Sequence, residues 1–106
     1  MKMTEFYQAL KTTLDVPVAY NHFDAQPKSI PFIAYTDQGK DTFLADDTIY
    51  AKSTNIRIEL YTTKKDLEME EKLENLLESI GLIWSDEPTI YIKSEKLFLH
   101  AYSVTI

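Results

Sequence analysis

Apolar residues near the start of the chain recur every three to four positions, which predicts an amphipathic helix over 4–14. The residues in this stripe are Phe6, Tyr7, Leu10 and Leu14. Thr4 is the expected N-cap, because its hydroxyl can accept a hydrogen bond from an amide of the first turn. Pro17 ends the helix, since the residue before a proline is driven out of helical geometry.

A second helical pattern lies over 66–80 and combines a leucine-rich stripe with many acidic residues. The stripe consists of Met69, Leu73, Leu76, Leu77 and Ile80. Thr63 and Asp66 stand at capping-box spacing before it, although the usual residue at the second position is Glu or Gln. Gly81 supplies the left-handed residue that stops the helix.

The remaining apolar segments have the period of two that is typical of strands. Strands are predicted over 16–23, 30–36, 55–61, 89–93 and 97–106, with turns over 85–88 and 94–96. The element order is therefore α-β-β-β-α-β-β. We expect one α+β domain over 1–106, with two helices packed on one side of a mostly antiparallel sheet.

The polar and acidic segment 37–53 allows two interpretations. Either the flanking strands extend into it, or it forms a protruding arm whose apolar residues contact a partner. In the second case the candidate subunit-contact residues are Phe43, Leu44, Ile49 and Tyr50.

Composition excludes several classes of chemistry. The chain of 106 residues has no cysteine, which removes disulfides, thiolate metal sites and cysteine nucleophiles. Two glycines are too few for a phosphate-binding loop or a dinucleotide fingerprint. The net charge is −6 and Arg57 is the single arginine, which disfavours tight binding of nucleic acid. No apolar run predicts a membrane span or a signal peptide.

Candidate chemistry is limited to two histidines and an acidic stripe. His22 and Asp24 would share a strand face and could orient a base or bind a metal, but a surface pair is the favoured interpretation. His100 is expected to be a hydrogen-bonded sheet histidine. We therefore predict no catalytic, cofactor-binding or metal-binding residues and no cofactor.

The acidic stripe consists of Glu70, Glu74 and Glu78, which lie four residues apart on the second helix. A solvated face opposite the leucines is a better interpretation than a divalent-cation site, because such sites usually need converging elements. Like charges at this spacing are mildly destabilising, so the stripe has a second candidate role as a face that repels polyanions or meets a basic partner.

Four segments together resemble a known family. They are Val-Pro-Val-Ala-Tyr-Asn-His-Phe (16–23), Ile-Pro-Phe-Ile-Ala-Tyr (30–35), Ile-Arg-Ile-Glu-Leu-Tyr-Thr-Thr-Lys-Lys-Asp (56–66) with the Glu-rich helix after it, and Ser-Glu-Lys-Leu-Phe (94–98). With the element order, they resemble the small tail-terminator, or head–tail joining, proteins of siphophages and prophages of Gram-positive bacteria. The resemblance covers nearly the whole chain.

The resemblance implies a structural virion component rather than an enzyme. Such proteins form a six-membered ring on the tail tube, stop its growth and join it to the head. The implied partners are other copies of the chain in a homo-hexamer, the major tail protein and the head connector or completion protein. DNA would pass without specific binding, along the acidic helix or the acidic part of 37–47. The implied location is the tail–neck region of the virion, after assembly in the bacterial cytoplasm. The alternatives are another phage neck or minor capsid component and a small soluble protein-binding module.

Overall fold

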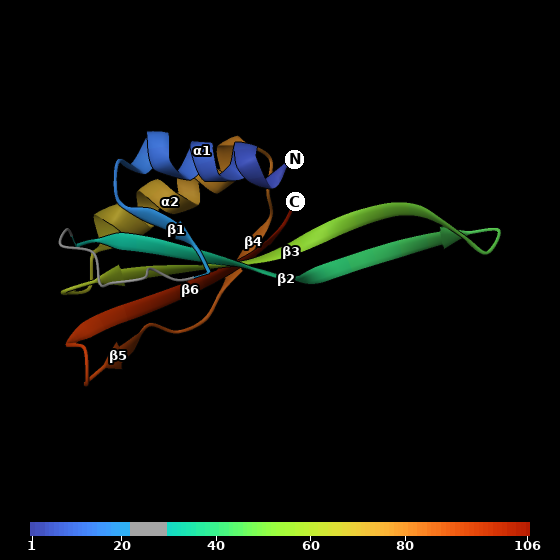
Figure 1. Ribbon diagram of the computed structural model, residues 1–106. Coiled ribbons are helices and arrows are strands. Elements are labelled where there is room, and N and C mark those ends of the chain that lie inside the picture. The colour runs from blue at the N-terminus through green and yellow to red at the C-terminus, as the bar shows by residue number, and fades with distance from the viewer. Residues whose placement is uncertain (22–29) are drawn as a thin grey trace.

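The computed structural model describes residues 1–21 and 30–106, except for the side chain of Tyr50. Two helices lie on one face of a twisted sheet, as Figure 1 shows. The helices are α1 (Met3–Leu14) and α2 (Leu67–Ser79). The strands are β1 (Val18–Tyr20), β2 (Phe32–Ala45), β3 (Thr48–Thr62), β4 (Trp84–Asp86), β5 (Ile90–Ile92) and β6 (Leu97–Thr105).

The sheet has the order β1-β2-β3-β6-β4, and β5 also pairs with β6. β1 runs parallel to β2, and every other described pair is antiparallel. This arrangement confirms the predicted α+β fold with a mostly antiparallel sheet and both helices on one side. The predicted element order is incomplete, because β4 lies where a turn was expected over 85–88. Three residues are too few to produce a recognisable period.

The core lies between the helices and the covered face of the sheet. Both predicted apolar stripes pack there, because helical spacing places each set on one side of its helix. Its fully buried members include Phe6, Leu10, Ile33, Ile58, Leu60, Leu73, Leu77 and Tyr102. No helix in the described part of the chain is long and apolar enough to cross a membrane.

The N-terminus of α1 differs from the prediction. The N-cap of α1 is Lys2, so Thr4 lies inside the helix and the N-cap prediction for Thr4 is wrong. The side chain of Glu5 accepts a hydrogen bond from the Lys2 amide at 3.0 Å. Asp66 is itself the N-cap of α2, and its carboxylate accepts from the Met69 amide at 3.1 Å. Gly81 has the expected positive φ, at 80°.

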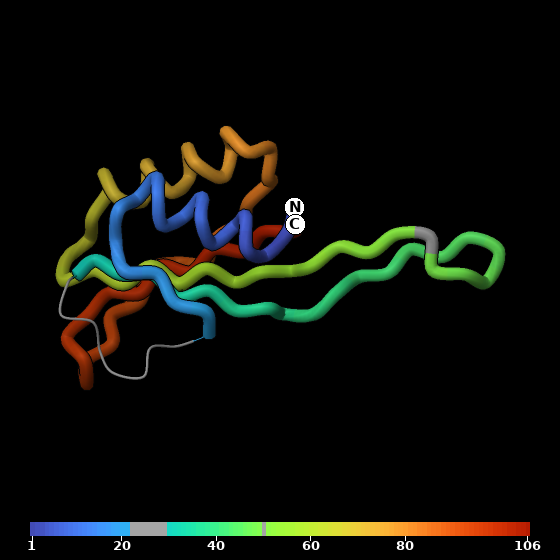
Figure 2. Tube along the Cα trace, turned by 45° about the horizontal axis from the view of Figure 1, so that its top comes forward, coloured from blue at the N-terminus to red at the C-terminus, as the bar shows by residue number. Residues whose placement is uncertain are grey.

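β2 and β3 continue far beyond the other strands. Their outer parts form a two-stranded ribbon that projects away from the helices and the remaining strands (Figure 2). The molecule is consequently elongated, with extents of 51 × 27 × 25 Å. The strands thus extend into 37–53, as the first interpretation predicts, and the extension projects as an arm. Contact of its apolar residues with a partner, the rest of the second interpretation, stays a prediction. We call residues 37–53 the arm.

Candidate functional site

The arm is an antiparallel hairpin with a two-residue turn and two shifts of register, one at its base and one between Phe43 and Leu44. Asp46 and Asp47 join its strands and both have positive φ, at 52° and 61°. Two-residue turns with this backbone match the twist of the flanking strands. At the base of the arm the register shifts between Asp37 and Lys40, where Gly39 has a φ of 102°. Such a bulge bends a strand, which re-aims the ribbon that follows.

The tip of the arm carries apolar side chains on both faces. Phe43, Leu44 and Ile49 are 55%, 69% and 51% exposed. Leu44 pairs with Ile49 across the ribbon, whereas the preceding residue, Phe43, pairs with Ala51. Because successive side chains in a strand point to opposite faces, Leu44 and Phe43 lie on opposite sides of the ribbon. The side chain of Tyr50, the fourth predicted contact residue, lies outside the described part.

The arm has no core of its own. Every described side chain from 37 to 52 is exposed. The last backbone bonds from the sheet to its base link Thr54 to Ile106, in both directions, at 2.9 and 2.8 Å. A two-stranded hairpin by itself is marginally stable in water, and exposed apolar side chains on such a ribbon favour association. The arm is therefore the candidate contact surface of this protein.

The acidic stripe of α2 is not a solvated face. Each of its carboxylates contacts the sheet: Glu70 lies 3.0 Å from His100 Nδ1, Glu74 accepts from the Tyr102 hydroxyl at 2.7 Å, and Glu78 accepts from the Trp84 indole at 3.0 Å. Glu70 is only 8% exposed and Glu74 is half-buried, while Glu78 remains exposed. The prediction of a solvated stripe is thus wrong for Glu70. Polar partners on β4 and β6 hold the stripe against the sheet.

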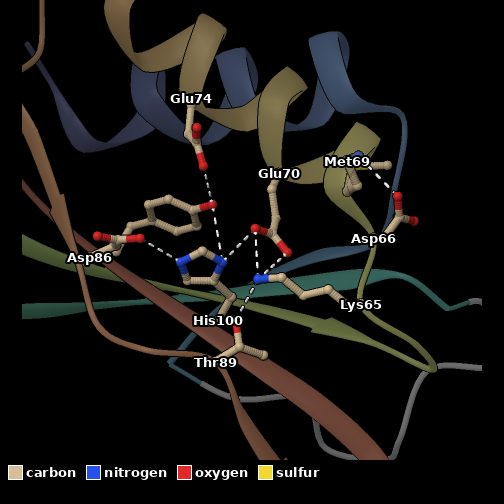
Figure 3. A network of polar contacts seen from close by, with 9 residues as sticks. Lys65, Asp66, Met69, Glu70, Glu74, Asp86, Thr89 and His100 are labelled. Carbon is tan, nitrogen blue, oxygen red and sulfur yellow. Dashed lines mark hydrogen bonds and ion pairs between the residues drawn. The ribbon is translucent and has the colours of Figure 1, made fainter.

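His100 lies at the centre of this network (Figure 3). Its Nδ1 faces Glu70 Oε1 at 3.0 Å, and its Nε2 faces Asp86 Oδ2 at 2.8 Å. Each ring nitrogen of His100 therefore lies within hydrogen-bonding distance of a carboxylate oxygen. The expectation of a hydrogen-bonded sheet histidine is confirmed. We call Lys65, Glu70, Glu74, Asp86, Thr89, His100 and Tyr102 the histidine network.

Four further side chains complete the histidine network: Lys65, Thr89, Tyr102 and Glu74. Lys65 Nζ lies 2.9 Å from Glu70 Oε2 and donates to Thr89 Oγ1 at 2.8 Å. The Tyr102 hydroxyl, which donates to Glu74, also lies 3.3 Å from His100 Nδ1. Burial raises the pKa of Tyr102, and the hydrogen bond to Glu74 and nearby carboxylates raise it further. The phenol therefore stays protonated and acts as a donor.

The chemistry of the histidine network is that of a structural clamp. A shallow open pocket of about 320 Å³ borders it, lined by Lys65, Asp86, Glu87, Pro88, Thr89 and His100. Its polar side chains are engaged: Asp86 faces His100, Lys65 donates to Thr89, and Glu87 pairs with Arg57 outside the network. Within residues 1–21 and 30–106, no three acidic, histidine or cysteine side chains converge to hold a metal ion. His22 and Asp24 lie outside the described residues.

Sequence reasoning missed Lys65, Asp86 and Thr89, which belong to the same network. They lie in a turn, a three-residue strand and a loop, where no periodicity marks a residue's direction. A signal was present for Glu70, which precedes Leu73 by three residues and Leu77 by seven. That spacing places its side chain on the edge of the buried stripe.

A scan against protein-family models finds no match to this chain, and a search of curated proteins finds none either.

Proposed function

We propose that this protein is a structural component of a phage tail, which caps the tail tube and joins it to the head as an oligomeric ring. The observation that carries the proposal is the arm, a ribbon with apolar side chains on both faces of its tip. An arm of this kind is stabilised when it packs against protein, so it suits a chain whose role is assembly. The resemblance of segments 16–23, 30–35, 56–66 and 94–98 to tail terminators supplies the specific assembly.

The position of the tip, far from the body of the chain, is also compatible with assembly into a ring. The arm tip lies far from the body of its own chain, so a contact with the body of a neighbour joins two different surfaces. Contacts between unlike surfaces generate closed rings when the rotation between subunits closes. Six copies is the number that the resemblance implies, with the major tail protein and the head connector as further partners.

The electrostatics favour passage of DNA over binding of DNA. The net charge is −6, and Arg57 is engaged by Glu59 and Glu87 at 3.3 and 3.1 Å. Of the two acidic surfaces considered for a channel, the α2 stripe is a weak candidate because Glu70 is buried. The acidic part of 37–47 is exposed throughout, and its acids below the tip, Asp37 and Asp41, are the better candidates.

Deletion of the gene in its source phage or prophage, followed by electron microscopy of the lysate, tests the proposal. We expect filled heads beside detached tails, some of abnormal length. Heads that lack connectors would instead assign the protein to the head side of the neck. Normal infectious particles would contradict a structural role in the virion and favour a small protein-binding module.

A further inference from the structure

We infer that the tip of the arm docks into a tyrosine-lined pocket on the body of a second copy of this chain. The inference rests on the proposed ring assembly and names the surface that receives the arm. The pocket lies between the first half of α1 and strands β1 and β2 and has a volume of about 380 Å³. We call it the tyrosine pocket; it is lined by Met3, Thr4, Tyr7, Gln8, Val18, Tyr20 and Tyr35.

The tyrosine pocket presents an aromatic surface that the fold leaves open. The Tyr7 and Tyr20 rings both pack against Tyr35, with ring centroids 6.2 and 5.4 Å apart. Tyr20 is nevertheless 52% exposed. The tyrosine rings can therefore pack against an apolar side chain of a bound segment, and their hydroxyls can hydrogen-bond to the backbone of that segment. Tyrosine is enriched at protein interfaces because it combines these two properties.

Charge selects the tip of the arm as the occupant. The turn at the tip carries Asp46 and Asp47, whose side chains make no ion pair among the described residues. A lysine borders the tyrosine pocket, because Lys11 Nζ donates to the hydroxyl of the lining residue Tyr7 at 3.3 Å. An acidic turn beside apolar side chains therefore meets an aromatic pocket beside a basic side chain.

A second pocket of about 380 Å³ beside β4 fits the tip less well. Ile83 and Trp84 line it, and Ile83 is 92% exposed. Two acids are bonded to its lining: Glu78 accepts from the Trp84 indole, and Asp41 accepts from the Asn55 side chain. Both would repel the aspartates of the arm turn, so this pocket serves as the control site.

The arm is long enough to reach a neighbouring body. From Asp37 to Ala45 the ribbon spans about 26 Å, at about 3.3 Å per residue. This length matches the shorter extents of the molecule, 27 and 25 Å. A tip that enters the pocket of the next copy leaves its own pocket free for the previous one, so the contact propagates around a ring.

Disulfide trapping in the purified full chain tests the inference, because the native chain has no cysteine. The test variant combines Ala45→Cys at the tip with Thr4→Cys at the tyrosine pocket. The control combines Ala45→Cys with Ile83→Cys at the β4 pocket. All three positions are exposed, and the apolar tip residues are kept. A disulfide forms only where Cα atoms come within about 7 Å, so cross-linking reports docking at the chosen pocket.

On oxidation we expect the Thr4 variant to form a ladder of dimers, trimers and higher multiples on a non-reducing gel, and the Ile83 variant to remain largely monomeric. A ladder from the Ile83 variant alone would overturn the inference. Assembly seen by sedimentation with a ladder from neither variant would also overturn it, while leaving the proposed function intact. A chain that stays monomeric up to about 1 mM overturns it as well. Normal phage after gene deletion would refute the proposed function even where the ladder forms.

A double-mutant cycle that removes charges from the arm tip and from Lys11 tests the same contact without cysteines. The pair Asp46→Asn and Asp47→Asn removes the tip charge and keeps residues that tolerate positive φ. We expect it to weaken association by about fivefold to tenfold, and Lys11→Gln to weaken it by about threefold, as screened surface pairs do. In the asparagine background Lys11→Gln should have no further effect. Equal losses in both backgrounds would place Lys11 away from the tip and contradict the assignment.

Discussion

The replacement Glu70→Gln should destabilise the protein far more than any exposed acid-to-amide change on the same helix. Glu70 Oε1 accepts from both His100 Nδ1 and Lys65 Nζ, at 3.0 Å each, and Oε2 lies 2.9 Å from the same lysine. Glutamine removes the negative charge and turns an NH₂ group toward one of these donors. In either orientation of the amide, that NH₂ group, which cannot accept, replaces a carboxylate oxygen that lies within 3.0 Å of Lys65 Nζ.

The expected loss of stability can be estimated from the burial of the contacts that Glu70 makes. A hydrogen bond to a charged group is worth about 1.5–3 kcal/mol, and the contact with His100 is buried on both sides. The Lys65 side chain is 46% exposed, so solvent reduces its contribution to about 0.5 kcal/mol. We expect Glu70→Gln to lower the free energy of unfolding by about 2–3 kcal/mol. For a domain of this size, that lowers Tm by roughly 10–20 °C.

The assay is urea unfolding at neutral pH, followed by the fluorescence of the single tryptophan, Trp84, and by circular dichroism. Glu71→Gln is the matched control, because Glu71 is the next residue of α2, is exposed and makes no side-chain ion pair or hydrogen bond with the part of the chain that the structure describes. Its effect should stay within about 0.5 kcal/mol. If Glu70→Gln lowers the free energy of unfolding no more than Glu71→Gln does, the structural role assigned to the histidine network is refuted.

Two further predictions concern tyrosine ionisation and the arm turn. Folding raises the pKa of Tyr102 above 10.0 and that of Tyr61 to about 12, so above pH 10 the unfolded chain loses protons first and the free energy of unfolding falls as pH rises. Each such tyrosine contributes a slope of about 1.4 kcal/mol per pH unit, and Tyr102→Phe should remove one contribution in urea titrations between pH 10 and about 12. Replacing Asp46-Asp47 by Asn-Gly, the preferred pair for this turn, should slow amide hydrogen exchange in the arm severalfold; unchanged exchange would refute the turn assignment.

The helices and the core could be predicted from the sequence because long periodic patterns determine which face is buried. The stripes of 4–14 and 66–80 pack as expected, and Gly81 ends α2 with positive φ. The N-cap of α1 could not be identified from residue type alone. Lys2 has the extended backbone of an N-cap, at ψ 149°, and its amide donates a hydrogen bond to the Glu5 carboxylate. Thr4 already lies inside the helix.

The candidate sites were only partly predictable, for a different reason. Phe43 and Leu44 could be identified as unusual because apolar residues interrupt a polar segment, a property of the sequence itself. The pairing of Glu70 with His100 depends on which side of α2 faces β6, which is a property of the tertiary packing. The tyrosine pocket likewise combines residues from α1, β1 and β2. No single stretch of sequence contains it.

The most direct test of the central claim, that the arm tip drives assembly, is complementation of the deleted gene by a folded arm variant. The variant carries Phe43→Asp and Leu44→Asp, and its control carries Thr42→Asp and Thr48→Asp, which add the same charge at exposed polar positions of the arm. Both should unfold at the same temperature as the native chain, because the arm lies outside the core. We predict that the control restores joined, infectious particles and that the tip variant leaves detached tails. Infectious particles from the tip variant would contradict the account.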